Sequence, residues 1–477
     1  MSKGKRLHPV AIFLLFFSGL KELIVPIIAA FFFGRGAATW EFPFTLYFVI
    51  GGFLLLFFYG YLKWLTFTYE VNCEELRIKQ GIMIKKNRFI RRERIYSIDI
   101  TAGVLQRMFN LVAVKVETAG GGNEPEVLLT AVTNQDALHI KKQLLDVGAQ
   151  TEMTNEQDII QDKTELIRWK LTTQNLFLAA LTSSGIGLAF MAILAIATQL
   201  EEWLGEQLIV DSLGYLFQSG LVLIVAMSVM ILLLAWILSI ISTLLKYGGF
   251  IIVKKDDELE ITRGVLEKRQ LTLSVSRITA IRVVESLLRQ PFGLVTVYVE
   301  SAGGGSKDEQ LSTILFPLIQ KRDLQRHLKE IIPDYSFDQP IDPLPKRAKK
   351  RYIIRKVIPA TFLAGLAAVF IPYGYVGAVL VLSLSYLLGE RQYKDAGVGN
   401  NDYFLWMTFR SISKTLVIIP RHRIQALEMK QSLFQKFRAL YTIKVSILTS
   451  VFGKSFSLVD ISKKQKEEIF SWYSYEK

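Results

Sequence analysis

The sequence is poor in the residues that form disulfides, bind metals and solvate a soluble surface. It has one cysteine among 477 residues, so no disulfide forms within the chain and the fold needs no oxidising compartment. The four histidines have no metal-ligand spacing, so we predict no metal site and no cofactor. Charged residues make up only 21%, and hydrophobic residues 51%, which excludes a disordered chain and disfavours a freely soluble one.

The chain does have long apolar runs. The five runs are Val10–Phe33, Phe42–Leu62, Leu176–Ala197, Leu221–Ser242 and Val357–Gly389. A helix needs about 20 apolar residues to cross a hydrocarbon core of ~30 Å, and each run meets that length. Pro372-Tyr-Gly predicts a turn inside the last run, so we predict six transmembrane helices in three hairpins. Each half of the last run gives only ~24 Å of helix, so a single long crossing is the alternative there.

The flanks of these runs orient the chain. Lys3, Lys5 and Arg6 precede the first run, and seven of the eleven residues from Lys346 to Lys356 are basic. The loop 199–215, between the third and fourth runs, has four acidic residues and no basic one. The positive-inside bias therefore predicts a multi-pass cell-membrane protein whose N-terminus and large hydrophilic segments are cytoplasmic. The net charge of +14 follows from this bias, so we predict no nucleic-acid partner.

Three hydrophilic segments follow the hairpins and are related to one another. The predicted division is hairpin 1–63, domain 64–165, hairpin 166–245, domain 246–350, hairpin 351–389 and domain 390–477. With a shift of 183 and no gap, Leu76–Gly122 aligns with Leu259–Gly305, and 18 of the 47 positions are identical. A shift of 329 aligns a divergent third copy, in which Arg410 stands at the position of Gly81. The chain therefore repeats a whole hairpin-plus-domain unit.

Each copy alternates apolar and polar residues over short stretches and closes with a helical one. In the first copy, Leu76–Lys79 and Val112–Glu117 alternate as strands do, and Gly81 predicts a turn. Thr133 or Asn134 predicts the cap of the closing helix, as Asp460 or Ser462 does in the third copy. We therefore predict an α+β membrane protein whose hairpins alternate with small β-sandwich or barrel domains, each with a C-terminal helix.

The first two copies end almost identically, in Val-Glu-Thr-Ala-Gly-Gly-Gly (116–122) and Val-Glu-Ser-Ala-Gly-Gly-Gly (299–305). With the upstream Arg-Ile, Phe and Leu-Val positions, this run resembles the bacterial pleckstrin-homology-like (PH-like) domain, and Arg6-Leu-His-Pro9 ahead of a hairpin fits it as well. Three such copies are similar to the YdbT-like family of multi-pass membrane proteins of Gram-positive bacteria. The resemblance implies three PH-like domains, no catalytic residues, a smaller PH-domain membrane protein as partner, and a role in cell-envelope or antimicrobial-peptide defence.

Two groups of charged residues are candidate sites. The first is a basic run in the first domain, suited to anionic headgroups or a partner protein, although a solvated strand face is the simpler interpretation. Its members are Lys85, Lys86, Arg88, Arg91 and Arg92. The second is Lys21 and Glu22, ~18 Å along the first apolar run and near the bilayer centre. They either face the helix bundle beside Pro26 or mark an interfacial segment before a span that begins nearer Leu23.

The remaining motifs give no catalytic arrangement. The glycine triplets lack the lysine and the helix of a nucleotide-binding loop and predict strand-to-strand turns. No Ser-His-Asp or paired-carboxylate pattern stands out, so we predict no enzyme. We predict a membrane scaffold whose cytoplasmic domains bind each other, a partner protein or lipid headgroups. A conduit for lipid or peptide is the alternative, and it requires polar residues facing a bundle interior, of which this chain has few.

Overall fold

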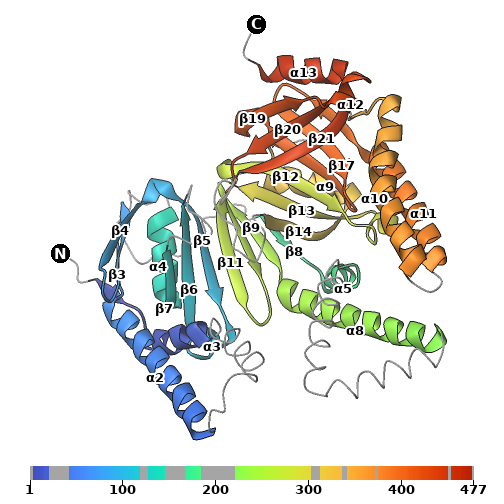
Figure 1. Ribbon diagram of the computed structural model, residues 1–477. Helices are drawn as coiled ribbons and strands as arrows, with labels where there is room; N and C mark the ends of the chain where they lie inside the picture. Colours follow the sequence, from blue (N-terminus) through green and yellow to red (C-terminus); the bar gives the residue numbers. More distant parts are fainter. Residues whose placement is uncertain are drawn as a thin grey trace. The chain divides into compact units, whose positions relative to one another are not determined.

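The structure is a computed structural model that describes ten segments of the chain (Figure 1). They are residues 4–20, 42–72, 74–118, 127–145, 167–183, 221–301, 312–335, 341–370, 374–449 and 453–474. The chain divides into two compact units. Unit 1 is Met1–Leu166, Lys255–Thr262 and Leu266–Arg277, and unit 2 is Ile167–Lys254, Arg263–Val265 and Ile278–Lys477. The division runs through the second copy, whose strands are shared between the units.

Unit 1 is built from two antiparallel sheets. The first has the order β1-β2-β3-β4, comprising β1 (Lys5–Arg6), β2 (Thr68–Val71), β3 (Glu75–Gln80) and β4 (Lys86–Arg91). In the second, the unit 1 strands follow the order β7-β6-β5-β11-β10. They are β5 (Ile95–Ala102), β6 (Leu111–Thr118), β7 (Val127–Thr133), β10 (Glu258–Arg263) and β11 (Lys268–Ser274). The helices are α2 (Phe42–Thr66), the short α3 (Val104–Met108) and α4 (Asn134–Leu145).

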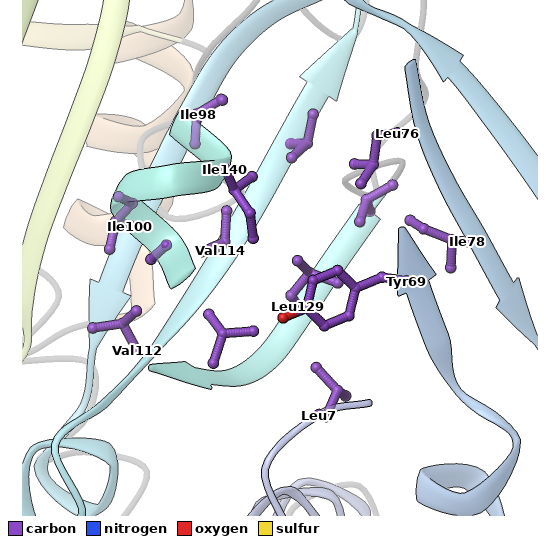
Figure 2. Close-up of a cluster of buried hydrophobic side chains, with 14 of the residues drawn as sticks. Leu7, Tyr69, Leu76, Ile78, Ile98, Ile100, Val112, Val114, Leu129 and Ile140 are labelled. Carbon is purple, nitrogen blue, oxygen red and sulfur yellow. The ribbon is translucent and has the colours of Figure 1, made fainter. Parts of the chain in front are cut away.

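The core of the first domain lies between these elements (Figure 2). Leu76 and Ile78 of β3 alternate with exposed neighbours, as the two-residue period of a strand requires. Ile98 of β5 and Ile140 of α4 belong to the same buried cluster. Burying one such side chain contributes ~1.5–3 kcal/mol, so the alternation seen in the sequence selects the inner face of the sheet. Helix α4 closes the domain, and Thr133 Oγ1 caps it by accepting from the Asp136 N–H.

Unit 2 contains a seven-stranded antiparallel sheet with the order β14-β13-β12-β18-β17-β16-β15. Its strands are β12 (Ile278–Glu285), β13 (Leu294–Ser301), β14 (Thr313–Gln320), β15 (Asp342–Pro343), β16 (Gly397–Asn400), β17 (Phe404–Arg410) and β18 (Lys414–Pro420). A three-stranded sheet follows, with β19 (Ile424–Lys430), β20 (Leu440–Ile447) and β21 (Lys454–Ser462), and β8 (Ile167–Lys170) pairs with β9 (Ile251–Lys255). The helices are α5 (Thr173–Leu181), α8 (Leu221–Tyr247), α9 (Lys321–Ile331), α10 (Lys349–Phe370), α11 (Gly374–Asp395), α12 (Leu433–Lys436) and α13 (Lys463–Tyr473).

The strands recur at the spacing of the sequence repeat. Strands β5, β12 and β19 begin at Ile95, Ile278 and Ile424, and β6, β13 and β20 begin at the equivalent leucines. The third copy therefore keeps the fold although it lost the glycine that turns the first two. Gly81 has φ +119° in the five-residue connection from β3 to β4. The connection from β17 to β18 is shorter, and neither Arg410 nor the residues of that connection have a positive φ, so no glycine is needed there.

Two helices in the described segments are long and apolar enough to cross a membrane, Val229–Tyr247 and Lys346–Val369. Two shorter apolar helices are Ala11–Leu20 and Ile50–Thr66. Other parts of the predicted spans lie outside the described residues, so six spans stay a prediction. The last apolar run forms two helices of 22 residues, α10 and α11, which pack side by side (Figure 1). Each helix is ~33 Å long because it extends into the charged flank, so it is longer than the ~24 Å expected from the uncharged run alone.

Candidate functional site

The predicted basic run forms an edge strand. Lys86, Arg88 and Arg91 lie on β4, Lys85 immediately precedes it, and Arg92 begins the short helical turn after it. All are exposed except Arg92, which is half-buried and donates its backbone N–H to Glu74 O at 2.9 Å. Since side chains alternate along a strand, Lys86 and Arg88 share one face and Arg91 projects from the other. The structure thus brings the five predicted residues together, but on two faces.

Strand β4 has one neighbour among the described strands. It pairs with β3, with Lys79 opposite Asn87 and Arg77 opposite Phe89, and it ends the sheet β1-β2-β3-β4. Phe89 is 61% exposed, and the Arg77 guanidinium lies 5.6 Å from the centre of its ring. The opposite backbone edge of β4 therefore offers N–H and C=O groups, flanked by cations and one aromatic ring, to an added strand.

The equivalent strands of the other two copies are paired on that edge. Strand β11 of the second copy pairs antiparallel with β5 of the first, and β18 of the third copy pairs antiparallel with β12 of the second. Lys268 stands opposite Ala102 in the first pairing, and Lys414 stands opposite Glu285 in the second. Lys268 and Lys414 occupy the same repeat position, and so do Ala102 and Glu285, so both pairings have the same register. Consecutive copies of the repeat are thus joined by one recurring sheet junction.

A buried aspartate pairs with a partly buried arginine at the first junction. Arg269 Nε donates to Asp99 Oδ2 at 2.9 Å, and Asp99 is 1% exposed. Nearby, Lys141 Nζ lies 2.5 Å from Glu260 Oε2. A one-residue slip of β11 would leave Asp99 without its cation, so the pair selects the register of the junction.

A second buried carboxylate lies where the second and third copies meet. Glu300, from the repeated Val-Glu motif, is fully buried on β13. It accepts from Lys454 Nζ of the third copy at 2.7 Å and from Arg282 Nε at 3.1 Å. Burial lowers the pKa of Lys454, while the charge of Glu300 opposes that shift. These carboxylates were not among the predicted site residues, because their partners are distant in the sequence.

Exposed apolar side chains also recur in the connection that follows β5, β12 and β19. We call these three connections the apolar tips. Met108, Phe292 and Phe437 are 74%, 68% and 87% exposed there. The full set is Val104, Leu105, Met108 and Phe109 in the first copy, Leu287, Leu288 and Phe292 in the second, and Leu433, Phe434 and Phe437 in the third. The repeat alignment pairs most of these residues, for example Met108 with Phe437 and Phe109 with Phe292, but it does not distinguish exposed apolar residues from core residues.

One polar side chain lies beneath each tip. Gln106, Arg289 and Gln435 occupy the same repeat position. Gln106 Nε2 donates to Thr130 O at 2.7 Å within the first domain. Arg289 donates to Thr182 Oγ1 and Ala179 O of the α5 segment, at 3.1 and 3.2 Å, so it links a tip to an apolar helix. Burial lowers the pKa of Arg289.

The third tip is linked to an apolar helix through Asp460. Gln435 Nε2 donates to Asp460 Oδ1 at 2.9 Å. The same carboxylate accepts from Arg351 and Arg355 of α10 at 3.1 and 2.9 Å. Asp460 therefore does not cap α13; Ser462 caps it, accepting from the Gln465 N–H at 3.2 Å.

The other predicted features lie outside the described segments or gain no support. Lys21 and Glu22 lie outside them, as do both glycine triplets and Cys73. Within the ten described segments, no three His, Cys, Asp or Glu side chains are grouped so that they would hold a metal ion. The features that remain are the basic edge strand, the sheet junctions and the apolar tips.

Comparison with known proteins gives the same three-part division. The bacterial PH domain family matches residues 17–147, 179–333 and 356–477. The chain is also 36% identical over 492 aligned residues to the UPF0699 transmembrane protein YdbT of Bacillus subtilis (strain 168), covering 100% of this chain and 99% of that protein. The three matches follow the repeat derived from the sequence and the recurring strands. The chain therefore belongs to the bacterial PH domain family, of which it carries three copies.

Proposed function

We propose that this protein is a non-enzymatic membrane scaffold whose cytoplasmic PH-like domains assemble proteins. The observation that carries the proposal is the recurring sheet junction, because it shows PH-like copies binding one another through strand edges. The membrane location is supported by the apolar helices and by the name of the Bacillus relative, a transmembrane protein. Strand addition gains affinity from main-chain hydrogen bonds, so such an edge accepts a strand from a separate protein as well.

Assembly is tested by weighing the full-length protein. We expect the chain, purified from native membranes in mild detergent, to run in complexes heavier than its own 54.2 kDa by native mass spectrometry. Proteins copurifying at fixed stoichiometry identify the partners, including a smaller PH-domain membrane protein or further copies of the chain. A population that is monomeric at all concentrations, together with transport of lipid or peptide in reconstituted vesicles, would favour a conduit instead.

Contact with anionic lipid is a second candidate function, favoured by the apolar tips. Two tips are linked to apolar helices through Arg289 and Asp460, which supports a position close to the membrane surface. Exposed apolar side chains near basic residues bind the headgroup region of a membrane. The basic residues around β4 would add about 1 kcal/mol each near an anionic surface.

Lysine footprinting tests lipid contact in the full-length protein. In vesicles that contain phosphatidylglycerol, we expect acetylation of Lys85 and Lys86 to be slower than in pure phosphatidylcholine vesicles. High salt should remove the difference, because exposed charges are screened. Lys463 and Lys464, exposed at the start of α13, serve as the internal control. Equal labelling of Lys85 and Lys86 in both lipids at low salt would exclude contact of this strand with anionic lipid.

A further inference from the structure

Each sheet junction joins two kinds of strand, and one described strand of each kind takes part in no junction. Two junctions use β5 with β11 and β12 with β18. Strand β4 is equivalent to β11 and β18, and it ends its sheet. Strand β19 is equivalent to β5 and β12, and it ends the sheet β19-β20-β21. Among the described strands, the protein therefore has two complementary open edges. We propose that β19 of one copy of this chain adds to β4 of a second copy, so that chains assemble head to tail.

The internal junctions predict the register of the intermolecular one. Shifting the observed pairs by the repeat spacing places Lys86 opposite Lys430, Arg88 opposite Glu428 and Phe89 opposite Leu427. The same shift puts Glu428 at the position of Asp99, and Lys86 at the position of Arg269. The Arg269–Asp99 ion pair is thus recreated as Lys86 with Glu428, and Arg88 adds a second cation. Lys430 opposes Lys86, and its observed ion pair with Glu428 at 2.9 Å offsets that repulsion.

Exposure distinguishes the open edges from the paired ones. Phe89 is 61% exposed, whereas Thr272 at the equivalent position of β11 is 2% exposed. Glu428 is exposed, whereas Asp99 at the equivalent position of β5 is buried. Positions that a junction covers in the middle of the chain are therefore uncovered at its ends. The charge match between β4 and β19 favours a second copy of this chain over an unrelated strand.

The proposed contact joins two different surfaces, so it does not close on itself as a two-fold dimer does. Heterologous contacts of this kind build closed rings or open filaments, depending on the rotation between subunits. We therefore expect oligomers of several sizes, or one ring, instead of a dimer only. The inference rests on the proposed scaffold function and names a second copy as the partner.

Disulfide trapping between differently tagged full-length chains tests the contact. Both chains carry Cys73→Ser; one also carries Lys86→Cys and the other Lys430→Cys. Directly opposite residues of antiparallel strands have Cα atoms ~4.5–5.5 Å apart, within the range that a disulfide spans. After mild oxidation of membranes that contain both chains, we expect a covalent dimer carrying both tags. The matched control is Ala426→Cys, which is exposed on the same strand but lies ~13 Å from residue 430.

Charge reversal checks the register independently. Glu428→Lys in the Lys430→Cys chain places a cation opposite Arg88, and we expect the dimer yield to fall about tenfold. Arg88→Glu in the other chain should restore it. If only the combination of both changes restores the dimer yield, general misfolding is excluded as the cause of the loss. Loss of lipid binding is excluded as well, because Arg88→Glu by itself lowers the positive charge of β4.

Each other outcome overturns the inference. Dimers carrying one tag only, or equal trapping through Ala426→Cys, would mean a different contact or random collision. No dimer carrying both tags, while the chain still copurifies with another protein, would overturn the self-assembly and leave the scaffold function standing. A protein with neither the dimer nor any copurifying partner would overturn both.

Discussion

In the third domain, Asp460 is a buried carboxylate that pairs with two arginines. It is fully buried, has φ +67°, and accepts hydrogen bonds from Gln435, Arg351 and Arg355. A left-handed backbone at a residue other than glycine is uncommon, and aspartate is among those that tolerate it best. The carboxylate needs both arginines because a buried charge without a partner is costly.

We predict that removing the cations costs more than removing the anion. Arg351→Ala with Arg355→Ala leaves Asp460 charged and buried, and should destabilise the third domain by about 3 kcal/mol. Asp460→Asn leaves two arginines whose side chains are 19% and 42% exposed, and should cost less because water still reaches them. Limited proteolysis of β20 and β21 during heating of the full-length protein measures the difference, with the exposed Lys350→Ala as control. Equal effects of the two changes would contradict this account.

The five basic residues around β4 were predicted because they are dense in the sequence, and their role in binding lipid or a partner stays a prediction. Asp99, Glu300 and Asp460 were missed because each pairs with a cation that lies 105–170 residues away. A lone acidic residue in an alternating strand gives no sign that folding will bring a cation to it.

At the level of elements, a short strand precedes each predicted helical hairpin and pairs with the first strand after it. These strands are β1, β8 and β15, which pair with β2, β9 and β16. Around β1, Leu7 is buried, and the His8 N–H donates to Ala131 O at 3.0 Å. The Arg-Leu-His-Pro motif of the sequence is therefore the segment that docks the N-terminus onto the first domain.

Acid should release this docking segment. Lys5 Nζ lies 2.7 Å from Asp136 Oδ1, and this hydrogen bond is the main cause that lowers the pKa of Asp136. Because the folded pKa lies below the unfolded value, the stabilisation is present above about pH 4 and is lost as pH falls through the folded pKa. We expect the amide protection factors of residues 5–8 to fall below pH 4 by hydrogen exchange.

Asp136→Asn should give that low protection at neutral pH and remove its pH dependence. Lys142→Ala, exposed on the same helix and outside the Lys5 pair, is the control. Protection that falls with pH to the same extent in wild type and Asp136→Asn would show that another group titrates.

Element boundaries were easier to predict than element partners. The period of two located β3 and β6, and the glycine position located the turn after β3. The same period says which face of a strand is buried, but not which strand lies beside it. The pairing of β5 with β11 therefore had no signal in either strand, and it emerged only from the structure.

At the level of the whole molecule, the boundaries of the compact units do not coincide with the boundaries of the sequence repeat. The sequence repeats as hairpin plus domain, and the three family matches follow that repeat. The first compact unit, however, includes β11 and most of β10, which belong to the second copy. The repeat could be predicted because duplication preserves residue identities. The staggered units could not, because they depend on a sheet junction between copies.

The first junction has a consequence during synthesis. Arg269 follows Asp99 by 170 residues, and the predicted second hairpin lies between them. At about 5–20 residues per second, the ribosome needs roughly 10–30 s to deliver β11 after β5. During that interval the nascent first domain has an open edge at β5 beside its finished core. A neighbouring nascent chain, or the β4 edge of a mature one, can pair with that edge during the interval, so membrane insertion of the second hairpin competes in time with mispairing.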